Sequence, residues 1–247
     1  MLTYKCYNSG SFETDDINHE KWKTSVPESH VLSQRPLIHL VKNCISESEQ
    51  KELLKLVKQK LTAKTNSGSS SSIYLQEKSD AKLAISRKIA RLAGMISKLP
   101  WKLAEPMSLT KYTTGQNYGL HYDSGFYMQD KKVKRMGTFL VYLNDVKSGG
   151  ETIFPYATND TSKIFDEIDI KKLPIKDVCS TEGLLKVLPR ARNCLLFHNH
   201  LSTDFGGVRD SWSLHGSCPI ISGEKLIAQI WLHDEPWGKD FGSFWTD

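Results

Sequence analysis

The stretch NYGLHYDSGF, residues 117–126, decides how this chain is interpreted, because it places His121 and Asp123 two positions apart. On a β-strand the side chains at i and i+2 project from the same face, so these two would point into the same space. An imidazole and a carboxylate arranged in this way suit two ligands of one metal ion. The alternative is a pair of polar residues on the solvent-facing side of an ordinary strand. A third ligand from elsewhere in the chain is needed to decide.

The third ligand has to be a histidine if the metal is an iron(II) ion bound by two histidines and one carboxylate. The candidates after the opening stretch are His198, His200, His215 and His233. His198 and His200 form a second i, i+2 pair, but the polar residues that follow them indicate a strand that ends in a loop. His215 differs, because it lies in a predicted strand that a turn at 222–223 separates from the last predicted strand, and we favour it.

The last of these strands, 224–233, has two different faces. From residue 226 to residue 232, its even-numbered residues are uniformly apolar and predict packing against helices or a second sheet: Leu226, Ala228, Ile230 and Leu232. Its odd-numbered residues are more mixed: Lys225, Ile227, Gln229 and Trp231. A lysine is almost never fully buried without a partner, so an inward Lys225 predicts a carboxylate that meets it. The odd face therefore indicates a pocket for a small anion, unless Lys225 reaches solvent at the strand end.

Helical signals precede strand signals along the chain. Ser46 and Glu49 form a capping box before an amphipathic helix, and a second helix follows that Pro100 stops. After a first strand in 36–44, further strands are predicted at 106–113, 119–123, 136–143, 151–154, 184–188, 193–198, 211–216 and 224–233. This order favours an α+β domain in which helices buttress a sandwich or barrel.

Three segments are expected to lie outside this framework. Residues 1–34 are polar without a clear period, and we interpret them as an N-terminal extension of a single domain spanning 35–247. Residues 66–72, NSGSSSS, predict a flexible connection. Residues 157–180 are rich in Asp, Lys and Thr and predict a mobile surface loop.

Composition narrows the class of protein. The 33 basic and 28 acidic residues give a net charge of +5, which is too small and too scattered to indicate nucleic-acid binding. No apolar stretch approaches the ~20 residues of a membrane span, and the N-terminus lacks the features of a signal peptide, so we expect no membrane partner and a cytoplasmic location. The cysteines contain no C-x-x-C pair, so reduced thiols are expected rather than a disulfide framework or a zinc site. They are Cys6, Cys44, Cys179, Cys194 and Cys218.

Three linked blocks of sequence resemble one known family. KYTTGQNYGLHYD (111–123), RMGTFLVYLNDVKSGGETIFP (135–155) and SLHGSCPIISGEKLIAQIW (213–231) are similar to iron(II)- and 2-oxoglutarate-dependent dioxygenases. Within these they resemble the prolyl 4-hydroxylases of plant, algal and collagen type, over most of the chain after residue 34. The resemblance implies a double-stranded β-helix, a jelly-roll or cupin-like barrel of two sheets that is open at one end and holds the metal inside.

The resemblance also implies a role for each matched residue. The iron(II) ligands would be His121, Asp123 and His215. Lys225 would pair with the far carboxylate of 2-oxoglutarate, and Tyr112 and Thr152 match positions that hydrogen-bond this cosubstrate. The positions that line the peptide site are matched by Tyr118, Arg135, Trp231 and His233, with the loop at 124–134 expected to cover them.

The implied reaction is hydroxylation of peptidyl proline at C4, coupled to oxidative decarboxylation of 2-oxoglutarate to succinate and carbon dioxide. Dioxygen is the second cosubstrate, L-ascorbate the expected reductant, and a proline-rich peptide in an extended conformation the expected partner. Two departures concern the substrate, because PRARNC at 189–194 replaces a Pro-Lys-Lys-Gly-Asp turn and no tryptophan follows Lys225 directly. The alternatives are a dioxygenase of the same fold that acts on peptidyl lysine or a small molecule, and a non-catalytic binding module.

Overall fold

A computed structural model describes residues 28–61, 70–75, 80–125, 127–128, 131–132, 134–159, 170–201, 207–233 and 245. The helices are α1 (Glu47–Lys60), α2 (Asp80–Ser97), α3 (Ile175–Ser180) and the short 3-10 helices η1 (Trp101–Leu103), η2 (Ile170–Lys172) and η3 (Ser211–Ser213). The strands are β1 (Ser29–Gln34), β2 (Leu37–Val41), β3 (Ser71–Tyr74), β4 (Ser108–Thr113), β5 (Tyr118–His121), β6 (Tyr127–Met128), β7 (Lys131–Lys132), β8 (Arg135–Tyr142), β9 (Ser148–Gly149), β10 (Thr152–Phe154), β11 (Leu185–Val187), β12 (Cys194–His198), β13 (His215–Ser217), β14 (Ile220–Ser222) and β15 (Glu224–His233).

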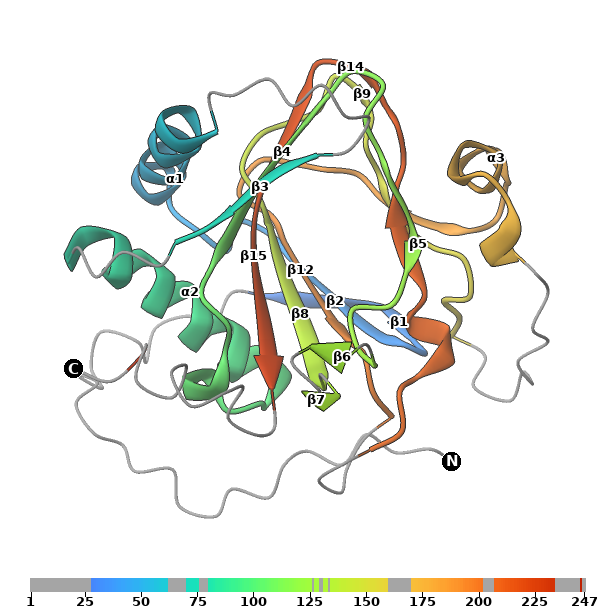
Figure 1. Ribbon diagram of the computed structural model, residues 1–247, viewed down its shortest axis with the longest axis horizontal. Coiled ribbons are helices and arrows are strands. Elements are labelled where there is room, and N and C mark those ends of the chain that lie inside the picture. The colour runs from blue at the N-terminus through green and yellow to red at the C-terminus, as the bar shows by residue number, and fades with distance from the viewer. Residues whose placement is uncertain are drawn as a thin grey trace.

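A seven-stranded antiparallel sheet, the major sheet, forms the centre of the fold (Figure 1). Its strand order is β1-β2-β12-β8-β15-β4-β3, so strands that are distant in the sequence lie side by side. Strand β15 pairs with β8 on one side and with β4 on the other, which places Ile227 opposite both Tyr142 and Thr110. The strand that carries Lys225 is therefore enclosed on both edges.

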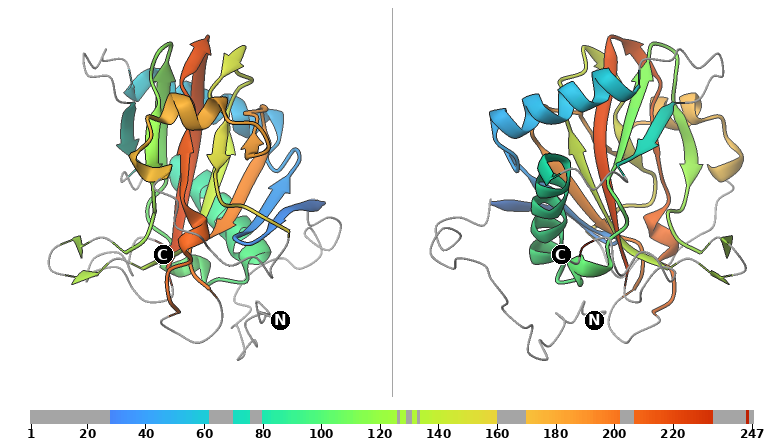
Figure 2. Two further views of the ribbon diagram at one scale, coloured as in Figure 1. Left: turned by 90° about the vertical axis from the view of Figure 1, so that its right-hand side faces the viewer. Right: turned by 60° about the vertical axis from the view of Figure 1, so that its left-hand side comes forward.

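Helices α1 and α2 cover one face of the major sheet (Figures 1 and 2). The predicted apolar face of β15 lies in a buried core cluster together with residues of both helices, such as Leu53 and Ile89. Burying one such side chain contributes about 1.5–3 kcal/mol, so this contact fixes the helices on the sheet. The alternation predicted for β15 is confirmed. Among the described helices, none combines the length and the apolar character that a membrane span requires.

Helix α1 begins where the sequence predicts. Ser46 Oγ accepts a hydrogen bond from the Glu49 backbone N–H at 3.3 Å, and a Glu49 carboxylate oxygen accepts one from the Ser46 N–H at 2.8 Å. This is the capping box, which satisfies two N–H groups that the helix itself leaves unpaired. Helix α2 ends at Ser97, shortly before Pro100. Both helix predictions are confirmed.

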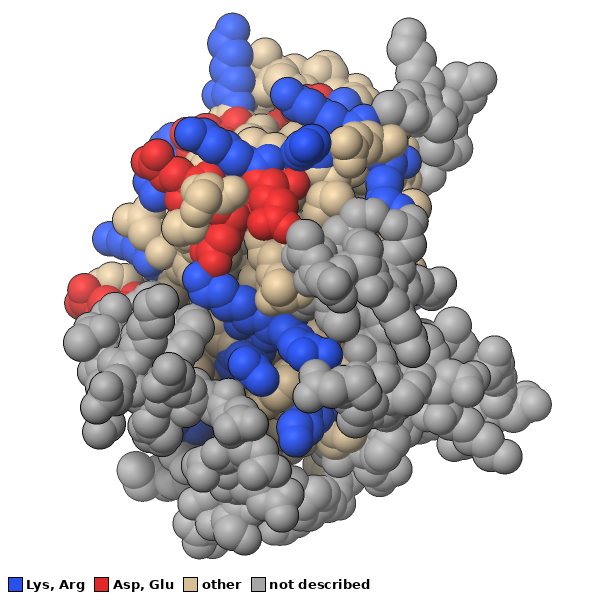
Figure 3. All heavy atoms as spheres, turned by 90° about the vertical axis from the view of Figure 1, so that its left-hand side faces the viewer, with Lys and Arg blue, Asp and Glu red and all other residues tan. Residues whose placement is uncertain are grey.

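The outer surface of these helices carries both signs of charge. Figure 3 shows Lys and Arg beside Asp and Glu in one part of this face, and a group of basic side chains in another. Lys88 of α2 forms an ion pair with Glu49 of α1, which links the two helices. Because a partly exposed ion pair contributes at most about 1 kcal/mol, the helices are held together mainly by the apolar core.

A four-stranded antiparallel sheet, the minor sheet, has the order β11-β10-β13-β5 and lies opposite the other face of the major sheet (Figure 2). A second core cluster contains residues of both sheets, among them Phe154 of β10 and Phe197 of β12. In the described part of the chain, no strand of one sheet pairs with a strand of the other. The fold is therefore an antiparallel, sheet-rich α+β fold whose sheets are not joined into a closed barrel.

Two glycines of the GGETIFP segment allow a close backbone approach. Gly149 and Gly150 have φ angles of 80° and 77°, a region that side chains disfavour. A Cβ atom on Gly149 would lie 2.2 Å from the carbonyl oxygen of Pro219, where β9 pairs with β14. A Cβ atom on Gly150 would lie 2.6 Å from Cδ1 of Ile220 in β14. The glycines therefore bring β10 against the segment that precedes β15.

Three predicted segments differ from the structure. Strand β1 lies within the predicted N-terminal extension and pairs with β2, so the folded region begins before residue 35, while residues 1–27 lie outside the described residues. The predicted strand 211–216 is divided into η3 and β13, because Asp210 caps a turn by accepting a hydrogen bond from the Trp212 N–H at 2.9 Å. The predicted mobile loop 157–180 contains η2 and α3, and 160–169 lie outside the described residues.

Two disulfides correct the expectation of reduced thiols. Cys179 of α3 is bonded to Cys218, and Cys44 is bonded to Cys194 of β12, whereas Cys6 lies outside the described residues. The paired cysteines are 39 and 150 residues apart in the sequence, so no short spacing pattern reports them. The first disulfide holds α3 against the strand that begins at the candidate ligand His215.

Candidate active site

Three potential metal ligands meet at the inner face of the minor sheet. His121 of β5 and His215 of β13 are paired directly across the two strands. Nε2 of His121 lies 3.4 Å from Oδ1 of Asp123, and Nε2 of His215 lies 3.5 Å from Oδ2. These donor atoms all lie within 4.8 Å of one another, which suits one ion. The structure thus brings the predicted set together.

Asp123 reaches this position by a route that the sequence did not indicate. Strand β5 ends at His121, so the predicted strand 119–123 is too long, and Asp123 lies in the bend that follows. The alternation of strand side chains therefore does not by itself orient the carboxylate. Thr138 of β8 does so instead, because its hydroxyl donates to Oδ2 of Asp123 at 2.6 Å.

Backbone carbonyls orient both imidazoles. Nδ1 of His121 donates to the Gly119 carbonyl at 2.9 Å, and Nδ1 of His215 donates to the Ser213 carbonyl at 2.9 Å. Since a carbonyl can only accept, each Nδ1 carries a proton, and Nε2 is the ring nitrogen left to bind a metal ion. Both Nε2 atoms face Asp123, as coordination of one metal ion requires.

The charge state of the cluster also suits a cation. Burial alone would raise the pKa of Asp123, but the neighbouring His215 and His121 hold it well below its usual range. Burial lowers the pKa of His215 to about 4, and His121 contributes in the same direction. At neutral pH, a charged carboxylate therefore lies beside the neutral imidazole of His215. His121 is partly exposed, whereas Asp123 and His215 are buried.

The two rejected histidines lie outside this cluster. His200 is buried and its Nε2 lies 2.6 Å from the hydroxyl of Ser124, the residue after Asp123, but His200 does not belong to the group whose donor atoms lie within 4.8 Å of one another. Burial lowers the pKa of His198 to about 4, with a further contribution from His39. The preference for His215 over both agrees with the geometry of the described residues.

Lys225 points inward and is 1% exposed. Its Nζ donates to the Ser217 hydroxyl at 2.8 Å, and it lies 5.5 Å from the ring centre of Tyr112 and 5.8 Å from that of Tyr142. Burial lowers its pKa to about 7, an effect that Glu151 partly opposes. The carboxylate expected to meet an inward lysine is not provided by any described residue within ion-pair distance. A buried cation of this kind suits an anionic ligand.

Two tyrosines and a threonine surround the lysine. Thr152 of β10 lies 2.8 Å from the Tyr142 hydroxyl, and both side chains are buried. Burial raises the pKa of Tyr112 to about 12 and that of Tyr142 further, so both rings stay neutral and can donate a hydrogen bond. Tyr142 was missed in the sequence, although its spacing from Thr138 places the two on one face of β8.

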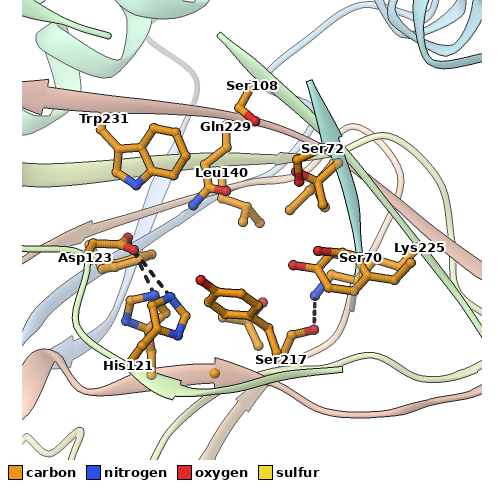
Figure 4. Close-up of a pocket in the computed structure, with 18 of the residues that line it drawn as sticks. Ser70, Ser72, Ser108, His121, Asp123, Leu140, Ser217, Lys225, Gln229 and Trp231 are labelled. Atoms are coloured by element: carbon orange, nitrogen blue, oxygen red, sulfur yellow. Dashed lines mark hydrogen bonds and ion pairs between the residues drawn. The ribbon is translucent and has the colours of Figure 1, made fainter. Parts of the chain in front are cut away.

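One cavity of about 250 Å³ connects these parts. In Figure 4, His121, Asp123 and Trp231 lie toward one end of the cavity, and Lys225 and Ser217 lie toward the other. We call them the metal end and the lysine end. The walls between them come from both sheets, and the lining residues are Ser70, Ser72, Tyr74, Ser108, Thr110, Tyr112, Tyr118, His121, Asp123, Arg135, Leu140, Thr152, Phe197, His215, Gly216, Ser217, Lys225, Ile227, Gln229 and Trp231.

A buried ion-pair cluster adjoins the metal end. Arg135 donates two hydrogen bonds to Glu105, at 2.5 and 2.8 Å, and its guanidinium carbon lies 3.9 Å from the ring centre of Trp231. Nε2 of His233 lies 2.8 Å from the same carboxylate. Burial would raise the pKa of Glu105, but its bonds to His233 and Arg135 lower it overall. Glu105 was not predicted, since a glutamate between Ala and Pro carries no distinctive pattern.

The predicted substrate-lining residues separate into two groups. Tyr118, Arg135 and Trp231 line the cavity, and Tyr118 is 45% exposed with its ring centre 4.2 Å from that of His121. His233 does not line it and is buried against Glu105. Its predicted contact with a ligand is therefore replaced by a contact with the residue that holds Arg135.

Strand β3 adds a wall that the sequence did not indicate. Of the predicted flexible connection 66–72, residues 66–69 lie outside the described residues, whereas the segment from Ser71 joins the edge of the major sheet. Ser72 of β3 lies 2.8 Å from the Thr110 hydroxyl, and both line the cavity. Within the predicted covering loop 124–134, β6 and β7 form a two-stranded ribbon, and 126, 129–130 and 133 lie outside the described residues.

Comparison with known proteins gives one consistent result. Residues 107–233 match the family described as the 2OG-Fe(II) oxygenase superfamily. Two similar relatives come from Arabidopsis thaliana. The probable prolyl 4-hydroxylase 6 is 35% identical over 227 residues, which cover 84% of this chain and 73% of the relative. Prolyl 4-hydroxylase 13 is 30% identical over 238 residues, which cover 90% of this chain and 80% of the relative.

A solved structure has the same fold. It is the viral collagen prolyl hydroxylase of Paramecium bursaria Chlorella virus-1 in its 2OG complex, which is 22% identical to this chain. The match has a TM-score of 0.55 and covers 78% of this chain and 93% of the viral chain. At this identity the likeness concerns the arrangement of the elements, and the roles of individual residues have to be argued from the site itself.

Proposed function

Since this chain belongs to the 2OG-Fe(II) oxygenase superfamily, we propose that it hydroxylates prolyl residues of a peptide at C4, with 2-oxoglutarate and dioxygen as cosubstrates. The observation that carries the proposal is one cavity with a His-Asp-His cluster at one end and a buried lysine at the other. The relatives' names, prolyl 4-hydroxylase, support the choice of proline. The reaction consumes one molecule each of 2-oxoglutarate and dioxygen and gives hydroxyproline, succinate and carbon dioxide. One atom of the dioxygen enters hydroxyproline and the other enters succinate.

His121, Asp123 and His215 would hold iron(II) at the metal end. The donor set fits, because two imidazole nitrogens with free lone pairs and one charged carboxylate form the ligand set typical of non-haem iron(II) oxygenases. When bound, iron(II) supplies the activation of dioxygen. The protein supplies orientation, a buried carboxylate that keeps its charge, and a cavity between two sheets that limits access of water.

Lys225 would bind the far carboxylate of 2-oxoglutarate. Its Nζ is buried beside Ser217 and no described carboxylate neutralises it, so the ligand would provide the missing partner. Tyr112 and Thr152 line the same end of the cavity and would donate hydrogen bonds to the cosubstrate. We include Tyr142 in this group because it is buried beside Thr152 and Lys225.

Tyr118, Arg135 and Trp231 would contact the peptide at the metal end, where they line the cavity. His233 would act indirectly, through Glu105 and Arg135. An extended proline-rich segment in the polyproline II conformation loses little conformational entropy on binding, and such segments dock into grooves lined by aromatic side chains. The segment 124–134, next to Asp123 in the sequence, would cover the bound peptide.

Three further expectations belong to this proposal. We infer that the two sheets form the double-stranded β-helix of the family, as a domain that begins with β1 rather than at residue 35. L-ascorbate is the proposed reductant. The two disulfides favour an oxidising compartment over the cytoplasmic location expected from the sequence.

The proposal is tested by incubating the protein with iron(II), 2-oxoglutarate and ascorbate in air, with either a proline-rich or a lysine-rich peptide. We expect the proline-rich peptide to gain the mass of one oxygen atom, located on proline C4, with one succinate formed for each oxygen gained. Oxygen gained on lysine would instead support the same-fold alternative. Absence of succinate with every peptide, despite metal binding, would support a non-catalytic binding module.

A further inference from the structure

Two described segments between β12 and η3, residues 199–201 and 207–210, pair with each other and lie against the bend that carries Asp123. We call these two segments the hairpin base. The Asp210 N–H donates to the Asn199 carbonyl at 2.9 Å, and the Leu201 N–H donates to the Val208 carbonyl at 3.0 Å. The hairpin base is therefore an antiparallel pair of segments whose backbone is fixed, so its side chains can hold neighbouring residues in place.

A first chain of hydrogen bonds runs from the hairpin base to the carboxylate. The side-chain amide of Asn199 donates to the Thr138 hydroxyl at 2.9 Å, and this hydroxyl donates to Oδ2 of Asp123 at 2.6 Å. Asn199 and Thr138 are fully buried, and Asp123 is 4% exposed. A hydroxyl has a single proton, so the bond received from Asn199 leaves that proton for Asp123. The amide thereby fixes the direction of the bond that orients the carboxylate.

A second contact reaches the residue that follows Asp123. Nδ1 of His200 lies 2.7 Å from the Gly207 carbonyl, which can only accept, so Nδ1 donates. Nε2 of the same ring lies 2.6 Å from the Ser124 hydroxyl, within hydrogen-bond distance. Both Ser124 and His200 are buried. The bend is thus held at Asp123 and again one residue later.

Arg209, on the other side of the hairpin base, packs against the same bend. Its guanidinium carbon lies 4.1 Å from the ring centre of Tyr122, and its Nη1 donates to the Ser124 carbonyl at 3.4 Å. Gly125 has a φ angle of 91°, and a Cβ atom there would lie 2.9 Å from Nη1 of Arg209. The arginine therefore occupies the space that this glycine leaves open.

The hairpin base also leads directly to the third ligand. The Asp210 carbonyl accepts hydrogen bonds from the Ser213 N–H at 3.0 Å and from the Ser213 hydroxyl at 2.7 Å. The Ser213 carbonyl in turn accepts the Nδ1 proton of His215 at 2.9 Å. One short segment is therefore linked to Asp123 at its first residues and to His215 at its last.

We propose that the hairpin base is the positioning element of the metal centre and sets the Asp123 carboxylate relative to His215. Asn199 and His200 are positioning residues that act through Thr138 and Ser124, and neither is a ligand. The inference rests on the proposed metal binding by His121, Asp123 and His215. Loss of a hydrogen-bond partner of a ligand typically weakens metal binding by about 10–100-fold, and we expect this range here.

The experiment measures the dissociation constant for cobalt(II), a probe with visible absorption, together with thermal unfolding of each metal-free variant. Thr138→Val keeps the shape of the side chain and removes the hydroxyl, so it should weaken cobalt(II) binding by about 10–100-fold. Thr138→Ser restores the hydroxyl and should bind within a few-fold of the unsubstituted protein. Asn199→Ala and Ser124→Ala should both weaken binding in the same direction as Thr138→Val.

Asn144→Ala is the matched control for Asn199→Ala. The Asn144 amide also bonds backbone groups, donating to the Glu224 carbonyl at 2.8 Å and accepting from the Leu226 N–H at 2.8 Å, and no described hydrogen bond links it to the ligands. It should lower the unfolding temperature and leave the cobalt(II) constant unchanged. The inference would be overturned if Thr138→Val, Asn199→Ala and Ser124→Ala all bound cobalt(II) as tightly as the unsubstituted protein does. This outcome counts when the unsubstituted protein binds cobalt(II) and His215→Ala does not. If the unsubstituted protein does not bind the metal, the proposed function fails first.

Discussion

The two ends of the cavity are built in different ways. At the metal end, Asp123 lies outside any strand, and a hydroxyl from β8 orients its carboxylate. At the lysine end, Lys225 lies in a ten-residue strand that is paired on both edges, and the one described hydrogen bond of its side chain goes to Ser217. The first end depends on chains of polar contacts, and the second depends on regular backbone and on burial of a charge.

This difference predicts which property a substitution would change at each end of the cavity. A polar substitution near the metal end changes geometry, because among the described residues the bend around Asp123 pairs with no strand and is held by side-chain contacts. A substitution at the lysine end changes charge, because the backbone of β15 stays fixed between β8 and β4. Metal affinity and cosubstrate affinity should therefore respond to different variants.

The largest effect is expected from His215→Ala. The variant loses one of three ligands and should lose more than about 100-fold in metal affinity, beyond the range for a residue that only supports a ligand. Peptide hydroxylation should fall below detection, as measured by oxygen gain in mass spectrometry. His30→Ala, in strand β1, is the control and should retain activity. Full activity in His215→Ala would refute the ligand assignment.

Lys225→Ala should weaken the binding of 2-oxoglutarate at the lysine end without changing metal binding. Removing one partner of a buried ion pair costs roughly 3–5 kcal/mol, which corresponds to an increase of hundreds-fold or more in the KM for 2-oxoglutarate. The cobalt(II) constant should stay the same. Lys111→Ala is the matched control, because Lys111 lies on the adjacent strand β4 in a partly exposed pair with Glu224 at 2.7 Å and should not change this KM. An unchanged KM in Lys225→Ala would contradict the cosubstrate role.

The two disulfides can be compared through their effects on stability and on metal binding. By loop length, Cys179–Cys218 constrains the unfolded chain by about 3–4 kcal/mol and Cys44–Cys194 by somewhat more. Replacing both members of either pair by serine should lower the free energy of unfolding, measured in urea. The Cys179–Cys218 variant should also weaken cobalt(II) binding, because Cys218 follows the strand of His215. The Cys44–Cys194 variant should leave the cobalt(II) dissociation constant unchanged. If both variants changed this constant equally, the expectation that only Cys179–Cys218 supports the metal centre would be contradicted.

The pH dependence sharpens the description of the lysine end. Burial lowers the pKa of Lys225 to about 7, so in the ligand-free protein the ammonium loses its proton as the pH rises through 7. Because the carboxylate ligand needs the charged form, the dissociation constant for 2-oxoglutarate should rise up to about tenfold per pH unit above 7. Lys225→Arg keeps its charge and should not show this slope. An equal slope in both proteins would exclude Lys225 as its source.

The same lowered pKa has a defined effect on stability. Between about pH 7 and 10.5, the unfolded chain binds a proton at this position that the folded chain has lost. The free energy of unfolding of the ligand-free protein should therefore rise with pH across that window. Lys225→Met should lack this contribution, as urea unfolding at several pH values would establish.

A smaller effect than those of His215→Ala and Lys225→Ala is expected from Arg135→Lys at the peptide side of the metal end. Lysine keeps the charge but loses the two-pronged bond to Glu105 and much of the stacking on Trp231, a change of about 1–2 kcal/mol. The KM for the peptide should rise about 5–30-fold, and decarboxylation without peptide should not change. Arg91→Lys is the control, because Arg91 stacks on Trp101 at 4.8 Å outside the cavity. A rise in the peptide KM of Arg91→Lys would show that the effect is general.

Sequence patterns predicted those parts of the fold that depend on residues close together in the chain. The capping box at Ser46 and the two faces of β15 depend on residues a few positions apart, and both are confirmed. Strand β1 was missed because its pairing with β2 supplies a stability that its polar sequence does not display. The serine-rich strand β3 was missed for the same reason, since it is defined by its pairing with β4.

For the site, the sequence provided the chemical groups and left out their supports. His121, Asp123, His215 and Lys225 could be selected by residue type, spacing and resemblance. Glu105 and Asn199 could not, because a buried polar residue has no periodic signature and acquires its partner only through tertiary contact. The disulfides were missed for a related reason, because each joins cysteines that lie in different elements.

The pairing of His215 with His121 has a consequence for the order of folding. These residues are opposite neighbours on β13 and β5, yet they come from distant parts of the sequence, so their pairing requires closure of a long loop. His121 and Asp123 alone would bind a metal ion weakly through two ligands. The complete site can form only after most of the chain is in place. We therefore expect metal capture to be a late event that reports on the folded state, rather than a nucleus that guides the chain toward it.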